Sequence, residues 1–209
     1  MCFSAPASFI SSGGLAVLGG ASLVIAKKED KILAAIPFLF GIQQAFEGIQ
    51  WLYINAGSTS LAAGYAFLFF AFIVWPIYVP TFVYILDKEK RSVLKWFIFL
   101  GIAVALYFLY ILFSQSLEIH RINACISYDF HFPLKKLINA AYLLVAFGSL
   151  FVSSKPIFRW FGSFIAISAL IAWLFFALTF ASVWCFFAAI TSAMFFFYIL
   201  YKPRPLRKS

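Results

Sequence analysis

One apolar stretch of the sequence contains four polar side chains that could do chemistry inside a membrane. They are Gln43, Gln44, Glu47 and Gln50, and the run around them otherwise has the composition of a membrane-spanning helix. Glu47 is the only one of the seven acidic residues that falls within a predicted span. A carboxylate at the centre of a bilayer costs about 2.5–3.5 kcal/mol or more, so such a residue is a candidate functional residue. It could supply a charge, carry a proton, or act as a general acid or base.

Helical periodicity gathers these side chains on one side of the predicted helix. Gln43, Glu47 and Gln50 are spaced i, i+4 and i+7, with Gln44 and Trp51 beside them. Glu47 would lie about seven residues, or roughly 10 Å, from the outer end of that helix. Three interpretations of Glu47 remain open: a hydrogen-bonded acid that joins helices, a site for a solute, proton or metal ion, and a catalytic acid or base.

The three cysteines form a second group of candidate residues. The topology argued below places Cys2, Cys125 and Cys185 outside or near the outer surface, where one disulfide could form and leave one thiol over. Loss of the initiator methionine would give Cys2 an α-amine beside its thiol, a pair that could bind a soft metal or act as a nucleophile. Cys185, next to Trp184, is the candidate partner of Cys2, although it could equally be a small buried apolar residue. The candidate metal ligands are therefore Cys2, Cys185 and Glu47.

The longest hydrophilic segment, residues 114–133, also contains residue types that bind metals. It holds His120, Cys125, Asp129 and His131, but their spacing matches no zinc signature, and a solvated loop is the simpler interpretation. No ordered motif supports a Cys/His/Asp nucleophile there. Haem and retinal are not expected, because both histidines fall in this loop and the last two predicted spans lack a lysine.

The composition defines the class of protein that must position these residues. Of the 209 residues 65% are hydrophobic and only 11% are charged, and the mean hydropathy is +0.99, whereas a soluble domain carries about 25% charged residues. The apolar runs are continuous, which favours helices over a β-barrel. We expect an all-α, seven-helix bundle that forms a single domain over residues 1–209. The expected spans are 9–26, 32–54, 61–86, 93–113, 134–152, 157–179 and 183–201, with a long outer loop at 114–133.

The distribution of basic residues predicts the orientation of the bundle. With the N-terminus outside and the C-terminus in the cytoplasm, thirteen of the sixteen Lys and Arg residues fall on the inner side and three on the outer side. This asymmetry is the positive-inside pattern of a multi-pass membrane protein, whose main partner is the lipid bilayer. The net charge of +9 is therefore attributed to topology and not to nucleic acid. The sequence does not predict the oligomeric state.

Three motifs together resemble an uncharacterised bacterial family of seven-span membrane proteins. They are MCFSAPASF at residues 1–9, QQ-x-x-EG-x-x-W at residues 43–51 and SVWCFFAA at residues 182–189. The resemblance extends over nearly the whole chain and implies a topology but no activity. It also implies that the following residues belong together: Cys2, Gln43, Gln44, Glu47, Trp51, Trp184 and Cys185.

These observations favour a polar pocket that opens outward. Glu47 and the glutamines would line one wall, Cys185 would stand opposite, and the Cys2 segment would fold back over it. The expected function is binding of a small solute or metal ion, for transport or sensing. One alternative is a membrane enzyme acting on a lipid-like substrate, with Glu47 as acid or base or Cys2 as nucleophile. A second alternative is a structural role with no site.

Overall fold

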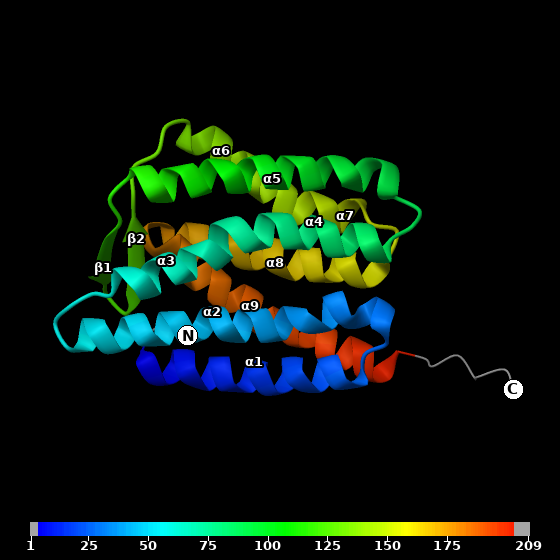
Figure 1. The fold of residues 1–209 in the computed structure, drawn as a ribbon, viewed down its shortest axis with the longest axis horizontal. Coiled ribbons are helices and arrows are strands. Elements are labelled where there is room, and N and C mark those ends of the chain that lie inside the picture. Colours follow the sequence, from blue (N-terminus) through cyan, green and yellow to red (C-terminus); the bar gives the residue numbers. More distant parts are fainter. Residues whose placement is uncertain (1–3, 203–209) are drawn as a thin grey trace, which may run out of the picture.

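The computed structural model describes residues 4–202, which form a bundle of antiparallel helices with one small hairpin at its end (Figure 1). The molecule is 81% helical, and seven helices are long and apolar enough to cross a membrane, as predicted. Their bounds are α1 Ala5–Ile25, α2 Lys31–Asn55, α3 Leu61–Phe69 with α4 Trp75–Leu86, α5 Arg91–Ser114, α6 Lys135–Leu143 with α7 Ser149–Val152, α8 Pro156–Phe175 and α9 Phe180–Tyr201. Short 3-10 turns lie at Lys28–Asp30 and Ala177–Thr179.

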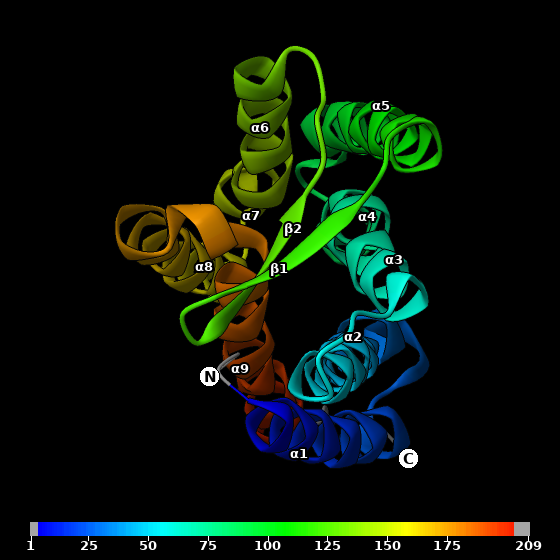
Figure 2. The ribbon, with the colours of Figure 1, turned by 90° about the vertical axis from the view of Figure 1, so that its left-hand side faces the viewer.

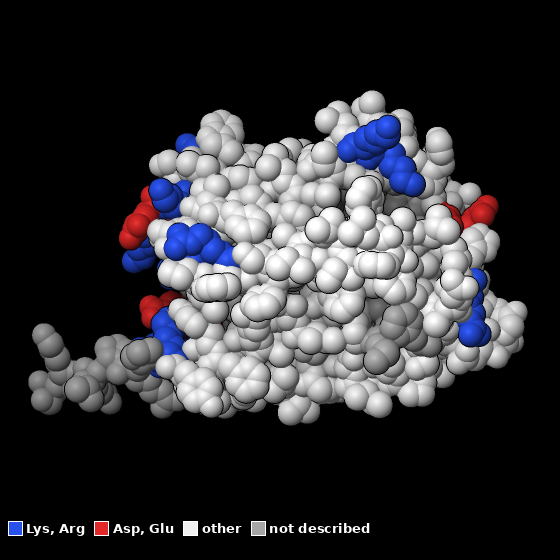
Figure 3. Space-filling view, turned by 180° about the vertical axis from the view of Figure 1, so that it is seen from behind, with Lys and Arg blue, Asp and Glu red and all other residues white. Residues whose placement is uncertain are grey.

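The helices stand around a common axis, and the hairpin crosses over one end of them (Figure 2). Helix α1 packs against α2 and α9, while α9 also contacts α2 and α8, and α4 contacts α5. We call the end that carries the hairpin, with residues 56–60 and 176–179, the hairpin end. The opposite end, with residues 26–30, 87–90, 153–155 and Lys202, is the basic end. Figure 3 shows charged side chains at both ends of one face, and a further group of basic side chains at its upper edge, set inward from the hairpin end.

The hairpin is a structural element that the sequence prediction of a long loop missed. Strand β1, Glu118–Ile122, pairs antiparallel with β2, Cys125–Asp129, and Asn123 takes a positive φ of 54° in the turn. Ile119 and Ile126 are buried, so the hairpin has an apolar side turned to the bundle. Gly64 of α3 makes this packing close, because any Cβ there would collide with the Ile119 side chain. An isolated two-stranded hairpin is marginally stable at best, so packing against the helices stabilises these strands more than their own pairing does.

The third membrane-crossing segment changes its helical register before its first proline. Residues Phe70–Val74 are π-helical, and the Trp75 N–H reaches the Phe70 carbonyl. Since Pro76 has no N–H, the next carbonyl in this register, that of Ala71, needs an outside donor. The Tyr142 hydroxyl donates to it at 2.7 Å. In an uninterrupted α-helix, Pro76 would leave the Phe72 carbonyl unpaired. The π-helical turn moves the unpaired carbonyl one residue back, to Ala71, and Tyr142 supplies its donor.

Candidate functional site

The polar residues of α2 are completely enclosed by the bundle. The side chains of Gln43, Gln44, Glu47 and Gln50 are all 0% exposed, and Trp51 is 1% exposed. We call these four polar residues the glutamine face. Helix α2 buries them because it lies between α1, α3 and α9. Glu47 is eight residues before the end of α2 at Asn55, which places it roughly 12 Å inside the hairpin end at 1.5 Å per residue.

Glu47 is joined to the start of α9. The Ser182 hydroxyl donates a hydrogen bond to Glu47 Oε1. One turn further along α9, the Cys185 thiol lies beside the Gln43 amide and near Glu47. Helix α9 therefore brings Cys185 beside Gln43 of the glutamine face.

Two glutamines of this face hold fixed orientations. The Trp75 indole N–H donates to Gln43 Oε1 at 2.7 Å, and the Trp75 ring stacks on Phe40 with centroids 3.9 Å apart. The backbone N–H of Ser60 donates to Gln50 Oε1 at 3.3 Å, next to the start of α3. Within residues 4–202 the amide nitrogen of Gln50 has no hydrogen-bond acceptor, and that of Gln43 faces only the weakly accepting Cys185 thiol.

Gln44 is on the side of α2 that meets α1. It lies between Gly41, whose Cα approaches the backbone of Ser12, and Gly48, whose Cα approaches the Phe9 ring. Neither the oxygen nor the nitrogen of the Gln44 amide has a partner among the described residues, and the same is true of the buried Ser8 hydroxyl. A buried polar group left unpaired costs about 1–3 kcal/mol, so this arrangement needs a physical explanation.

A cavity of about 50 Å³ lies next to the glutamine face, in the middle of the bundle. Its wall is aromatic and aliphatic, and the residues that line it are Ile36, Phe40, Trp75, Val79, Phe82, Tyr142, Ala146, Leu150, Phe161, Ile165, Trp184, Cys185 and Ala188. Cys185 and Trp184 are thus on its wall, whereas Glu47 and the glutamines are not. The indole N–H of Trp184 points away to the Ile165 carbonyl, at 3.3 Å. The outward-opening polar pocket remains a prediction.

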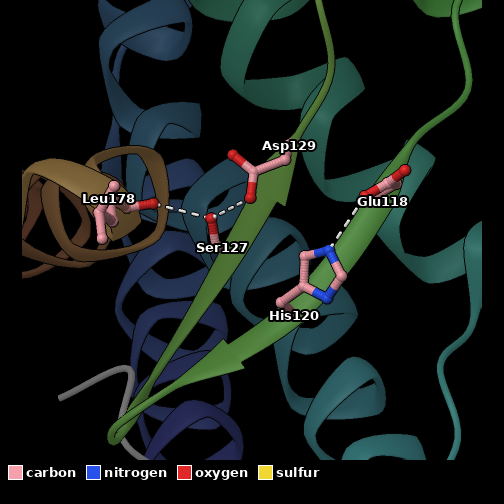
Figure 4. Close-up of polar contacts among 5 residues, drawn as sticks. All are labelled: Glu118, His120, Ser127, Asp129 and Leu178. Carbon is pink, nitrogen blue, oxygen red and sulfur yellow. Dashed lines mark hydrogen bonds and ion pairs between the residues drawn. The ribbon is translucent and has the colours of Figure 1, made fainter.

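Polar contacts within the hairpin and from the hairpin to the turn before α9 hold it at this end of the bundle (Figure 4). The Ser127 hydroxyl lies 2.8 Å from the Leu178 carbonyl and 2.9 Å from Asp129 Oδ2, which ties β2 to the turn before α9. The Arg121 guanidinium lies over the Trp51 ring, 5.6 Å from its centroid. His120 and Glu118 form an exposed ion pair at 3.2 Å.

The cysteines and the hairpin residues do not assemble a metal centre within residues 4–202. Cys125 and Cys185 are buried free thiols, and no group of three or more His, Cys, Asp and Glu residues lies close together in this part of the chain. Burial raises the pKa of the Cys125 thiol more than its hydrogen bond with Thr179 lowers it, so Cys125 is protonated at neutral pH. Cys2 lies outside the described residues, and its predicted role as ligand or nucleophile stays a prediction.

Two buried acids at the basic end were missed by the sequence analysis. Asp87 is 1% exposed and accepts hydrogen bonds from the Ser153 hydroxyl at 2.7 Å and from the Ser154 N–H and hydroxyl at 2.6 and 2.9 Å. Burial alone would raise the pKa of Asp87, but these hydrogen bonds outweigh it and lower the pKa below its ordinary value of 3.8. Asp30 binds Lys202 Nζ through both carboxylate oxygens, at 2.8 and 2.9 Å.

By the length and composition of its helices, this is a helical protein of the multi-pass membrane class. One acid and three amides are enclosed near one end of it. The chain belongs to a family of unknown function, DUF6629, whose members' common pattern matches residues 1–209. This agrees with the expectation of a family without an established activity. No curated protein and no solved structure matches the chain.

Proposed function

We propose that this protein is a bacterial inner-membrane protein that binds a small solute or ion at the glutamine face, for transport or sensing. The observation that carries the proposal is the group of buried amides around Glu47 whose hydrogen-bonding groups are not all satisfied by the described residues. Such groups persist in native structures when function or an occupant offsets their cost. An acid held among them, about 12 Å deep, is suited to select a solute by charge and hydrogen bonding.

The proposed orientation puts the hairpin end outside and the basic end in the cytoplasm. Its support is the charge distribution: at the hairpin end the described basic residues are Arg121, Lys135 and Lys136. At the basic end they are Lys27, Lys28, Lys31, Lys88, Lys90, Arg91, Lys95, Lys155, Arg159 and Lys202. The positive-inside rule assigns the richer end to the cytoplasm.

A labelling experiment tests this orientation. Single cysteines are placed at Ser58, in the exposed loop of the hairpin end, and at Lys88, exposed at the basic end, in a Cys2→Ser background. A membrane-impermeant maleimide applied to intact cells should label Ser58→Cys alone. Labelling of Lys88→Cys alone would reverse the orientation.

A binding experiment tests the function. Full-length protein in nanodiscs is melted with a panel of divalent cations, amino acids, amides and sugars, and its metal content is measured after purification. At least one solute or ion should raise the melting temperature of the wild type and of the surface control Glu89→Gln, but not of Glu47→Gln. If no solute shifts the melting temperature, and Glu47→Gln leaves cell growth and protein stability unchanged, the structural role is the better account.

A further inference from the structure

The orientation of two amides indicates what kind of group the site can receive. An indole N–H and a backbone N–H can only donate, so the oxygens of Gln43 and Gln50 must face Trp75 and Ser60. Their NH2 groups are thereby directed elsewhere, as donors. This assignment follows from the donors themselves, whereas an amide without such neighbours could be turned either way.

Unused donors outnumber unused acceptors on the glutamine face. The amide nitrogens of Gln44 and Gln50 have no acceptor among the described residues, and that of Gln43 has only the weakly accepting Cys185 thiol beside it. Only one amide oxygen, that of Gln44, has no donor. A bare cation bound here would face N–H groups, which repel it. The chemistry that satisfies the face is a carbonyl, amide or hydroxyl oxygen, which accepts hydrogen bonds.

The charge of the surroundings narrows the class further. Glu47 is fully buried and receives the Ser182 hydroxyl, a donor that stabilises a carboxylate. No Lys or Arg among the described residues is buried in this site, so an anionic ligand would lose its hydration with no described cation to pair with. A neutral acceptor avoids that cost.

The adjoining cavity sets the size and polarity of the remainder of the ligand. Trp75 belongs to both places, because its indole N–H bonds Gln43 while its ring lines the cavity. Cys185 also lines the cavity and lies beside Gln43. Apolar cavities stay dry, and one of about 150 Å³ accepts benzene. A cavity of about 50 Å³ therefore suits an alkyl group of two to four carbons, on the order of one third of that volume.

We infer that the ligand is a small, uncharged, amphipathic molecule with a carbonyl or amide head and a short branched or linear alkyl tail. The head accepts a hydrogen bond from the Gln43 amide, in place of the weakly accepting Cys185 thiol, and the tail fills the cavity between Trp75, Trp184 and Cys185. This inference rests on the proposed function, because it names the class of solute for the same site.

Three probes of one shape test the inference: isobutyramide, isobutyrate and isobutylamine. Binding to full-length protein in nanodiscs is followed by tryptophan fluorescence, since Trp75 and Trp184 line the cavity. The neutral amide should bind at least tenfold more tightly than either charged probe. Gln43→Met, which keeps the length of the side chain and removes the N–H donors, should weaken it tenfold or more. Gln115→Leu, at an exposed position, should leave it unchanged.

A second variant keeps the test decisive if Gln43→Met fails to fold. Ala188→Val narrows the cavity from α9 and should weaken isobutyramide more than acetamide, whose tail is shorter. Tighter binding of isobutylamine, isobutyrate or a divalent cation, lost in Glu47→Gln, would overturn the inference and leave the proposed function standing. If none of the probes, cations or solutes binds, both are overturned.

Discussion

Glu47 and Asp87 are both buried acids, yet their surroundings differ in kind. Asp87, at the basic end, is surrounded by donors that point at it: Ser153, Ser154 and the turn that follows α4. Glu47, at the hairpin end, receives Ser182 but lies among glutamines whose amide nitrogens have no oxygen acceptor within residues 4–202. The hydrogen bonds around Asp87 are complete, whereas the amides around Glu47 keep donors that no oxygen of the described residues accepts.

This difference separates structural acids from candidate site residues better than burial does. A buried carboxylate that accepts several charge-assisted hydrogen bonds joins elements of the fold, and its neighbours have no capacity left for a ligand. Unused donors near a buried acid cost free energy in the empty protein and are offset when an acceptor binds. Stability should therefore be most sensitive at Asp87, and binding should be most sensitive at the glutamine face.

The largest expected effect is that of Asp87→Ala. It leaves the hydroxyls of Ser153 and Ser154 and three backbone N–H groups, those of Glu89, Lys90 and Ser154, without their shared acceptor, and it separates α4 from the turn before α8. We expect a loss of about 3–5 kcal/mol in the free energy of unfolding, measured by denaturant titration in mixed micelles. Glu89→Gln, two residues away and exposed, is the control and should change little. An effect no larger than that of the control would remove the distinction between the two acids.

Acid pH should weaken the basic end through the same residue. The pKa of Asp87 lies below its ordinary value of 3.8, so its contribution to stability is fully present above about pH 4 and is lost as the pH falls through the folded pKa. Melting temperatures measured from pH 6 down to pH 3 should fall less steeply for Asp87→Asn than for the wild type. Equal slopes for the two proteins would show that other carboxylates control the acid response.

The ion pair of Lys202 with Asp30 should have a moderate effect and the opposite pH dependence. Burial would lower the pKa of Lys202, but Asp30 outweighs it and raises the pKa above 10.5. Its contribution is present below that value and is lost as the pH rises through the folded pKa. Lys202→Met should cost about 1 kcal/mol at pH 7, because the lysine is partly exposed. It should also flatten the alkaline limb of the stability profile above pH 10, and an unchanged limb would contradict this.

The sequence was sufficient for features that depend on local pattern. Seven apolar runs predicted seven helices, and the i, i+4, i+7 spacing of Gln43, Glu47 and Gln50 placed them on one buried face. The cysteine that the sequence put opposite them, Cys185, lies beside Gln43. Composition and periodicity are enough here because the sequence of each helix contains the pattern of its own apolar and polar sides.

Features that depend on distant partners were not predictable in the same way. The role of Asp87 requires Ser153, 66 residues later, and the Ala71 carbonyl requires Tyr142, 71 residues later. The close packing of the hairpin on α3 requires Gly64, which has no side chain to collide with Ile119. In the sequence Asp87 follows an apolar run and precedes four charged residues, a pattern that is the same for an exposed loop acid.

Glu47→Gln should have a small effect on stability and a large effect on binding. The amide oxygen can still accept from Ser182, and the side chain keeps its shape, so we expect a change within about 1 kcal/mol in the free energy of unfolding. Any solute that stabilises the wild type should lose its effect. A loss of stability as large as that of Asp87→Ala, without change in binding, would make Glu47 a structural acid like Asp87.

Gln44→Leu should have the smallest effect on stability. The sign of that effect tests most directly whether the glutamine face differs from the surroundings of Asp87. The substitution conserves most of the volume and removes two buried polar atoms that have no partner among the described residues. The empty protein should be unchanged or more stable by about 1 kcal/mol, measured as above. In an incomplete site this gain accompanies weaker binding, whereas in a complete structural cluster the same variant destabilises the protein. Gln115→Leu is the matched control, because it makes the same chemical change at an exposed position.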